Sequence, residues 1–312
     1  MRALTCVVGA SIAFLAFRAE VSALQDNGAP GVPVSVTITA EPGRGKAIPT
    51  LTKNDVAVFQ NKNKRPVLEL TPLGQSNQST QLLLLISDSA RGSFDTEINT
   101  LKQFINSLPA STEIGVGYMR NGTNQMVANF TRDHASAANS IRLVSGVGGA
   151  DVSPYDSLSE AIKKWPNTAA ERREIIMISS GIEGLGGGFT SQNPYVDRAI
   201  SDAQKAGVVV FTIYTPGVGH YGHAFWRSTW GQNFLSQLAD ETGGDSYMIG
   251  FGSPVSFQPF LQSITENLKH QYRLTFAANP EKKAGLQPIR VESVEKNATI
   301  AAPDRVYVKA GM

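Results

Sequence analysis

Hydroxyl groups and one carboxyl group follow an unbroken apolar run early in the sequence. Residues 82–86 are all leucine or isoleucine, and the next residues include Ser87, Asp88, Ser89 and Ser93. An apolar run of this length is typical of a strand buried on both faces of a parallel sheet, although periodicity alone does not distinguish it from a buried helix. Ligands of open α/β sheets bind at the carboxyl ends of the strands. We therefore expect this polar segment to form part of a binding site.

More hydroxyl groups occur at two other places that the same sheet would bring to this edge. A second apolar run, residues 175–178, ends in Ser179 and Ser180, and Ser153 precedes a predicted helix. Serine side chains also cap helices. The serines therefore have two interpretations: they line a binding site, or they only cap the helices that follow.

Signatures of catalysis are absent from the sequence. It contains no Gly-x-Ser-x-Gly elbow, no phosphate loop ending in Gly-Lys-Ser/Thr and no His-Glu-x-x-His. Asp88 lies near Ser89 and Ser93, but no histidine accompanies them to complete a triad. The single cysteine, Cys6, lies in the N-terminal segment. We expect no catalytic residues, and a hydrolase that uses the loops at the sheet edge is the alternative.

Two predicted loops carry aromatic side chains and two of the four histidines. His220 and His223 are three residues apart, but a zinc site needs a third protein ligand and none is nearby. Both loops follow predicted buried strands, so we expect them at the same edge as Ser87, where aromatic residues and arginine are common in binding surfaces. The alternative is that the aromatic rings only pack over helix starts. The predicted partner-binding rim consists of Phe189, Tyr195, His220, Tyr221, His223, Trp226 and Arg227.

Strand-like and helix-like segments alternate through the middle of the chain. Apolar strands are predicted at residues 81–87, 174–180 and 208–214, and a hairpin within residues 113–130 turns at Asn121-Gly122. This alternation predicts an α/β fold with a doubly wound, mostly parallel, Rossmann-like sheet. The predicted helices are residues 94–108, 133–143, 155–164, 195–206, 231–242 and 254–270, with residues 215–230 as a long loop.

Strand patterns without helices flank this region on both sides. Residues 32–40 alternate between apolar and polar side chains, residues 66–73 form another predicted strand, and the tail from residue 271 to 312 returns to the same patterning. We expect the tail to pair with the N-terminal strands. One small β module would then form from both flanks of the chain.

The segment at residues 87–93 resembles the Asp-x-Ser-x-Ser signature of von Willebrand factor type A (VWA) domains. Residues 51–59, with matches at Leu51, Asp55 and Val58, resemble the segment that precedes this domain in an acidobacterial VWA-related group, and the tail resembles the tail of the same group. The resemblance implies a protein-binding domain. It also implies a metal-ion-dependent adhesion site, in which Mg²⁺ is bound by oxygen ligands and itself binds a partner's carboxylate.

The ligands that the resemblance implies for the first loop are an aspartate and two hydroxyls, and two registers are open. If Asp88 is the signature aspartate, the hydroxyl positions fall on Ala90 and Gly92. If Ser87 takes that place, Ser89 matches the first hydroxyl, but the acid is lost and Arg91 occupies the second hydroxyl position.

The other two loops also depart from the implied ligand set. Val152 takes the place of the second-loop threonine, with Ser153 or Asp151 available after a shift, and Ser180 replaces the third-loop acid. Because negative charge is lost, we expect a degenerate metal site and no cofactor. A Mg²⁺-dependent adhesin with a non-standard ligand set is the alternative, with Asp88, Ser89 and Asp151 as its candidate ligands.

Composition and the N-terminus indicate an exported protein. The chain has 312 residues and a formal net charge of only +2, which gives no strong attraction to nucleic acid or anionic membranes. Residues 1–23 resemble a signal peptide, with a basic Arg2, an apolar run and a small-residue cleavage site, although a retained anchor is the alternative. We expect a secreted or periplasmic (cell-envelope) protein with no membrane span after cleavage.

These observations combine into one predicted organisation. The predicted parts are a signal peptide (1–23), a leader (24–31), an N-terminal β module (32–74), a VWA-like α/β domain (79–270) and a C-terminal β extension (271–312) that packs with the N-terminal module. The predicted function is non-enzymatic recognition of a protein partner through loops at the carboxyl edge of the sheet.

Overall fold

The fold is described from a computed structural model. It describes residues 31–43, 47–74, 79–90, 92–145, 153–166, 170, 172–184, 192–217, 225–250, 252 and 255–311. The predicted signal peptide lies outside these residues.

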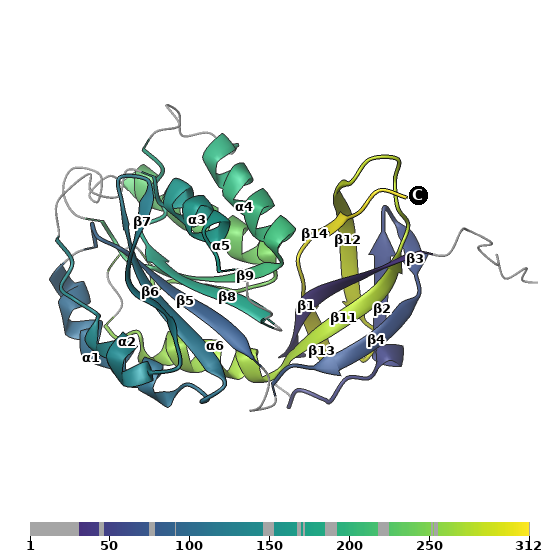
Figure 1. Ribbon diagram of the computed structural model, residues 1–312, viewed down its shortest axis with the longest axis horizontal. Helices are drawn as coiled ribbons and strands as arrows, with labels where there is room; N and C mark the ends of the chain where they lie inside the picture. Colours follow the sequence, from purple (N-terminus) through teal and green to yellow (C-terminus); the bar gives the residue numbers. More distant parts are fainter. Residues whose placement is uncertain are drawn as a thin grey trace, which may run out of the picture. The chain divides into compact units, whose positions relative to one another are not determined.

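A six-stranded sheet forms the centre of the α/β domain (Figure 1), with the strand order β10-β9-β8-β5-β6-β7. Numbered along the chain and counted from β7, this is the 3-2-1-4-5-6 order of a doubly wound sheet. Only β7 runs antiparallel to its neighbour. The predicted fold class is therefore confirmed. The strands are β5 (Thr80–Ser87), β6 (Thr112–Arg120), β7 (Thr123–Thr131), β8 (Arg172–Ser179), β9 (Val208–Tyr214) and β10 (Ser246–Tyr247).

Helices cover both faces of this sheet and bury the apolar strands between them (Figure 1). Side chains alternate along β5, so Leu82 and Leu84 pack with α1, α2 and α6, whereas Leu83 and Leu85 pack with α3, α4 and α5. The helices are α1 (Ile98–Ser107, preceded by the 3-10 turn η2, Gly92–Glu97), α2 (His134–Asn139), α3 (Pro154–Lys163), α4 (Pro194–Ala206), α5 (Phe225–Thr242) and α6 (Gln258–Lys269).

The two flanks of the chain form a β-sandwich, as the sequence predicts. Its sheets have the orders β13-β1-β11-β4 and β14-β12-β2-β3, so each sheet contains strands from both flanks. Their inner faces share one core, to which Ile38, Val58, Phe276 and Val308 contribute. The elements are β1 (Val32–Pro42), η1 (Lys53–Asp55), β2 (Val56–Gln60), β3 (Asn63–Arg65), β4 (Val67–Pro72), β11 (Gln271–Ala278), β12 (Gly285–Ser293), β13 (Ala298–Ala301) and β14 (Arg305–Val308).

The hairpin predicted within residues 113–130 is confirmed. Asn121 and Gly122 both have positive φ angles, 51° and 71°, and they connect β6 to the antiparallel β7. Two consecutive residues with positive φ form the turn that matches the twist of a hairpin, and Asn-Gly favours it.

The prediction of a loop through residue 230 is wrong, because α5 begins at Phe225. Gly231, the predicted start of the helix, lies inside α5 against the loop that follows β8. A Cβ at Gly231 would collide with the carbonyl oxygen of Ser180. The glycine therefore permits a close approach of two backbones and does not end or begin the helix.

Two predicted helices also need correction, and two short strands have no counterpart in the sequence prediction. The helix predicted at residues 133–143 is shorter in the structure, where α2 ends at Asn139. The helix predicted from residue 254 begins at Gln258. The short strands β3 and β13 lie in segments without a clear sequence pattern, and both lie at sheet edges, where pairing on one side is enough to order them.

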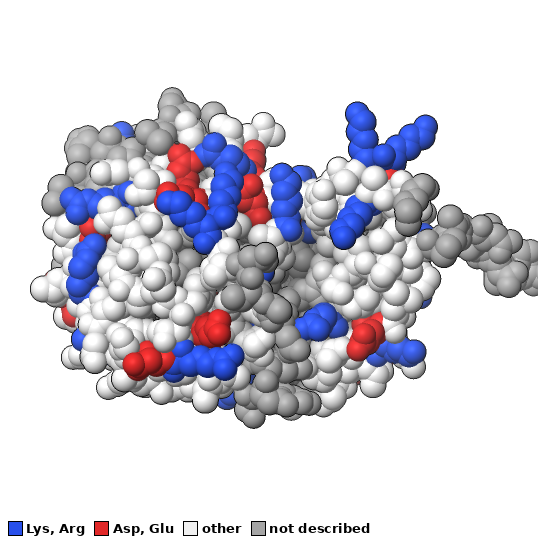
Figure 2. Space-filling model, viewed as in Figure 1, with Lys and Arg blue, Asp and Glu red and all other residues white. Residues whose placement is uncertain are grey.

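Acidic and basic side chains are interspersed over the α/β domain on the face that Figure 2 shows. Ion pairs join Lys163 to Asp202 and Arg198 to Asp156, which links α3 to α4. This mixture agrees with the small net charge and gives no surface field of a single sign on that face.

Candidate functional site

The parallel strands β5, β8 and β9 bring three loops together at their carboxyl ends. In the loops beyond β5 and β9, Ala90 and Gly217 form an isolated β-bridge. A Cβ at Gly217 would lie 3.6 Å from the Cβ of Ser180, which follows β8. Ser87, Ser89 and Ser180 therefore belong to adjoining loops, as expected from the sheet.

The serine hydroxyls at this edge bond to one another and to nearby backbone. The Oγ atoms of Ser87 and Ser89 are 3.0 Å apart, and both residues are buried. Ser179 Oγ accepts a hydrogen bond from the Gly181 N–H at 3.1 Å, and Ser180 Oγ accepts one from the Ile182 N–H at 3.4 Å. The hydroxyls after β8 thus fix the turn that leads away from the strand.

Asp88 lies in the turn after β5, and its carboxylate contacts other groups than these hydroxyls. Its carboxylate accepts hydrogen bonds from Arg142 Nη1 at 2.7 Å, from the Ser145 N–H at 3.0 Å and from Arg120 Nη1 at 3.4 Å. Burial alone would raise the pKa of Asp88, whose residue is 0% exposed, but the bonds from Arg142 and Ser145 hold that pKa below its ordinary value. The carboxylate is therefore ionised and compensated by arginine.

Arg142 is itself held in place by Tyr118. The Tyr118 hydroxyl accepts a hydrogen bond from the Arg142 N–H at 2.9 Å and donates one to the Arg142 carbonyl at 2.7 Å. The guanidinium group lies 3.9 Å from the centre of the Tyr118 ring. These contacts fix the guanidinium beside Asp88, which links the loop after α2 to the end of β5.

A buried acid that the sequence interpretation missed lies in the loop after β8. Glu183 is 4% exposed and accepts a hydrogen bond from Ser153 Oγ at 2.7 Å. Ser153 caps α3, because its Oγ also accepts from the Asp156 N–H. The sequence does contain a signal for this acid. Glu183 lies only four residues beyond the last residue of β8, and an acid this close to the end of a parallel strand lies near the carboxyl edge of the sheet.

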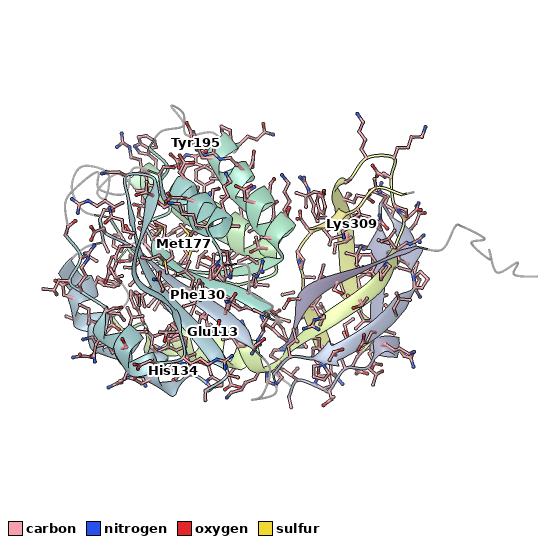
Figure 3. All side chains as sticks on the ribbon, in the orientation of Figure 1. Glu113, Phe130, His134, Met177, Tyr195 and Lys309 are labelled. Atoms are coloured by element: carbon pink, nitrogen blue, oxygen red, sulfur yellow. The ribbon has the colours of Figure 1, made fainter. Side chains whose placement is uncertain are left out.

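The described part of the predicted rim consists of the starts of α4 and α5. Phe225 and Trp226 in the first turn of α5 are 70% and 47% exposed, and Arg227 lies 5.0 Å from the Trp226 ring. Tyr195 at the start of α4, labelled in Figure 3, is half-buried and packs on the core beneath α3, α4 and α5. Phe189, His220, Tyr221, His223 and Asp151 lie outside the described residues, as does the side chain of Ser93.

Within the described ranges, no group of three or more His, Cys, Asp and Glu side chains is placed to hold a metal ion. In the same residues, no helix has the length and apolar character needed to cross a bilayer.

The chain resembles known proteins only in its structure. No protein-family model matches the chain, and no curated protein matches it. Among solved structures, the chain is similar to BatB from Bacteroides thetaiotaomicron, with 14% identity over 61% of this chain and 97% of that chain and a TM-score of 0.43. An aerotolerance-related membrane protein from Bacteroides fragilis has 10% identity, coverages of 61% and 98% and a TM-score of 0.44.

A third solved structure, the SpRpn10 VWA domain, has 14% identity over 60% of this chain and 95% of that domain, with a TM-score of 0.38. The fold assignment rests on the order and direction of the strands. The chain has a doubly wound, Rossmann-like α/β fold. Membership of the acidobacterial group stays a prediction.

Proposed function

We propose that this protein is a non-enzymatic protein-interaction protein with a degenerate metal site. It recognises a partner through the loops and helix starts at the carboxyl edge of the sheet. The proposal includes export, with residues 1–23 as a signal peptide and the mature chain secreted or in the cell envelope.

The engagement of Asp88 is the observation that carries this proposal. Both of its carboxylate oxygens already face cationic or N–H donors, from Arg142, Ser145 and Arg120. The hydroxyls of Ser87 and Ser89 face each other instead. This geometry favours the register in which Ser87 replaces the signature aspartate, so the acid of the first loop is lost.

The remaining donors do not fit Mg²⁺. This ion requires near-octahedral oxygen ligands and is usually held by one or two carboxylates. At the positions implied for two acids, the chain has the neutral hydroxyls of Ser87 and Ser180. Shape and aromatic contacts, rather than a shared cation, would then provide the attachment to a partner.

The surface offered for this attachment begins at α5. Phe225 and Trp226 have large apolar side chains that are 70% and 47% exposed, and Arg227 lies beside the Trp226 ring. Tryptophan and arginine are the residues most enriched among those that contribute most to binding at interfaces.

Partner capture tests the proposal. Immobilised full-length protein is incubated with culture and envelope fractions of its source, and the Trp226→Ala/Arg227→Ala variant is compared with the wild type. We expect one or more saturable partners whose recovery falls by about tenfold in the variant, the size of effect typical of an interface tryptophan. Leu68→Ala, at an exposed apolar position on β4, is the matched control. Equal capture by wild type and the rim variant, with both folded, would refute the assignment of the rim.

One observation favours a second candidate, a Mg²⁺-dependent adhesin with a non-standard ligand set. Glu183 places a buried carboxylate against Ser153, the residue next to the position implied for the second-loop threonine. Calorimetric titration with Mg²⁺ and Mn²⁺ separates the candidates. Saturable micromolar binding that Glu183→Gln abolishes would support the adhesin, and absence of binding supports the degenerate site.

A further inference from the structure

A cavity of about 390 Å³ lies between the edge of the sheet and the end of α3, and the proposed function does not use it. Gln81 and Glu113 in its lining are the second residues of β5 and β6, and Asn124 pairs with Met119 near the end of β6, so the lining extends along β6. Its volume falls in the range of small-molecule sites. The lining residues used below are Gln81, Glu113, Asn124, Met126, Phe130 and Trp165.

Two glycines on β6 allow side chains of β7 to lie over this strand. Gly115 and Gly117 lie between Glu113 and Met119 on the face that α3 covers, and neither places a side chain between sheet and helix. A Cβ at Gly115 would lie 3.1 Å from Met126 Cε and 3.5 Å from Phe130 Cδ1. Side chains from the neighbouring strands therefore approach the glycines and form an apolar floor.

Two aromatic rings form adjacent walls above this floor. The centres of the Phe130 and Trp165 rings are 4.8 Å apart, and their planes are inclined by 44°. Phe130 comes from β7 and Trp165 from the segment after α3, and Figure 3 labels Phe130 and Glu113 on neighbouring strands. The ring centres are too close for a group to enter between them, so an organic ammonium group would lie over a ring face that lines the cavity, where the negative face attracts it.

Two side-chain donors of the lining, those of Trp165 and Gln81, already donate within it, and acceptors remain for a ligand. Trp165 Nε1 donates to Gln81 Oε1 at 2.8 Å, and Gln81 Nε2 donates to Glu113 Oε2 at 2.9 Å. Asn124 Oδ1 is buried and accepts no hydrogen bond from the described residues. A ligand that brings positive charge or N–H and O–H donors would complement this arrangement.

The charges around the cavity also favour a cation. Lys164 Nζ lies 2.6 Å from Glu160, and the Lys164 side chain is 70% exposed, so solvent largely screens its charge. Arg132 lies 3.6 Å from Glu113, but its side chain is 61% exposed, so this ion pair is weak and readily exchanged. Glu113 is thus the acid that a bound cation would meet beside the aromatic walls.

We propose that this cavity binds a small organic ammonium ion with apolar substituents, such as a choline-like compound. The rings of Phe130 and Trp165 contact the substituents, and the Glu113 carboxylate compensates the charge. A free ammonium compound and the headgroup of a choline lipid share this chemistry.

Calorimetric titration of the full-length protein tests the proposal with choline chloride and, in parallel, with phosphatidylcholine vesicles. The neutral isostere 3,3-dimethyl-1-butanol measures the contribution of charge. We expect saturable binding of at least one choline form and about tenfold weaker binding of the isostere, because the cation–π and carboxylate attractions are lost. Binding of free choline alone assigns a soluble ligand, and binding of the vesicles alone assigns a lipid headgroup.

Variants locate the binding in this cavity. Glu113→Gln retains an acceptor for Gln81 and removes the charge, and Phe130→Leu keeps an apolar side chain and removes an aromatic face. Each should weaken choline binding by about fivefold or more. Glu266→Gln, which removes an exposed acid on α6, should leave it unchanged. The proposal would be overturned if neither free choline nor the vesicles bound, or if the neutral isostere bound as tightly as choline. Unchanged choline affinity in both cavity variants would overturn it as well.

Discussion

At the scale of single residues, the environment of Asp88 separates this chain from the ligand set that its sequence resembles. β5 ends at Ser87 and Asp88 lies in the turn that follows, so the two residues meet different surroundings. The carboxylate is held by arginines and an N–H group on one side, and the hydroxyls pair on the other. One position of register thus decides whether the acid faces the binding edge.

Loss of Arg142 should destabilise the protein. Arg142→Ala leaves the buried Asp88 carboxylate with only its longer contact to Arg120 and the Ser145 N–H. Because Arg142 is partly exposed, we expect a loss of about 2–3 kcal/mol in the free energy of unfolding, measured by urea denaturation. Arg132→Ala, which removes an exposed ion pair, should cost less than about 1 kcal/mol. Equal effects would show that the Asp88 pair contributes little.

Restoring negative charge should create metal affinity. The Ser87→Asp/Ser180→Asp variant places carboxylates at the two positions where the resemblance implies acids. Because Mg²⁺ is usually held by one or two carboxylates, we expect calorimetry to detect saturable binding in the variant that exceeds wild-type binding by about tenfold or more. A folded double variant with unchanged affinity would contradict the register that places Ser87 at the signature aspartate.

Glu174 should make stability depend on pH. Burial raises the pKa of Glu174 to about 8, against the lowering effects of Arg172 and Gln271. Between the ordinary value of 4.5 and about 8, the folded state holds one proton more than the unfolded chain. The free energy of unfolding should therefore fall by about 1.4 kcal/mol per pH unit as pH rises through this interval.

The Glu174→Gln variant tests this dependence. It should be more stable than the wild type at pH 8, and its stability should vary less between pH 5 and pH 8, as followed by thermal and urea unfolding. Glu266→Gln, at an exposed position on α6, is the control and should keep the wild-type profile. A variant with the same slope as the wild type would assign the pH dependence to other groups.

At the scale of elements, close contact between backbones explains the unexpected length of α5. Helix propensity favours alanine over glycine by about 1 kcal/mol, so propensity alone predicts that Gly231→Ala stabilises the protein. The collision of a Cβ with the Ser180 carbonyl predicts the opposite. We expect a net loss of about 1–3 kcal/mol in thermal or urea unfolding.

Asn233→Ala is the control for this element, because Asn233 is an exposed position on the same helix. It should leave stability nearly unchanged. If Gly231→Ala proved stabilising, α5 would have to lie farther from the loop after β8 than the structure places it.

At the scale of the whole molecule, the β-sandwich depends on both ends of the described chain. β1 pairs with β11 and β2 pairs with β12, although these partners are more than two hundred residues apart in sequence. Such pairings carry a large loss of chain entropy, which only the shared core of both sheets offsets.

Removal of residues 271–312 should therefore unfold the N-terminal strands. The core partners of Ile38 and Val58 from the tail would be lost, and limited proteolysis should cleave within residues 31–74 faster than in the full chain. The six strands of the α/β sheet all lie between Thr80 and Tyr247, so cleavage there should be slower. Protection of residues 31–74 in the truncated chain would contradict this dependence.

The sequence by itself determined the elements whose signal is local. Apolar runs identify β5, β8 and β9, and Asn121-Gly122 identifies the hairpin, because burial on both faces and positive φ each restrict residue type. Alternation of these elements is enough to predict the doubly wound sheet.

Only the tertiary structure decided what depends on contacts between distant residues. The pairing of Asp88 with Arg142, the contact of Ser153 with Glu183 and the passage of Gly231 against Ser180 each join segments far apart in sequence. Local residue patterns predict which side chains reach the sheet edge. They do not predict which direction each side chain faces or which partner it meets, because packing of the whole fold sets both.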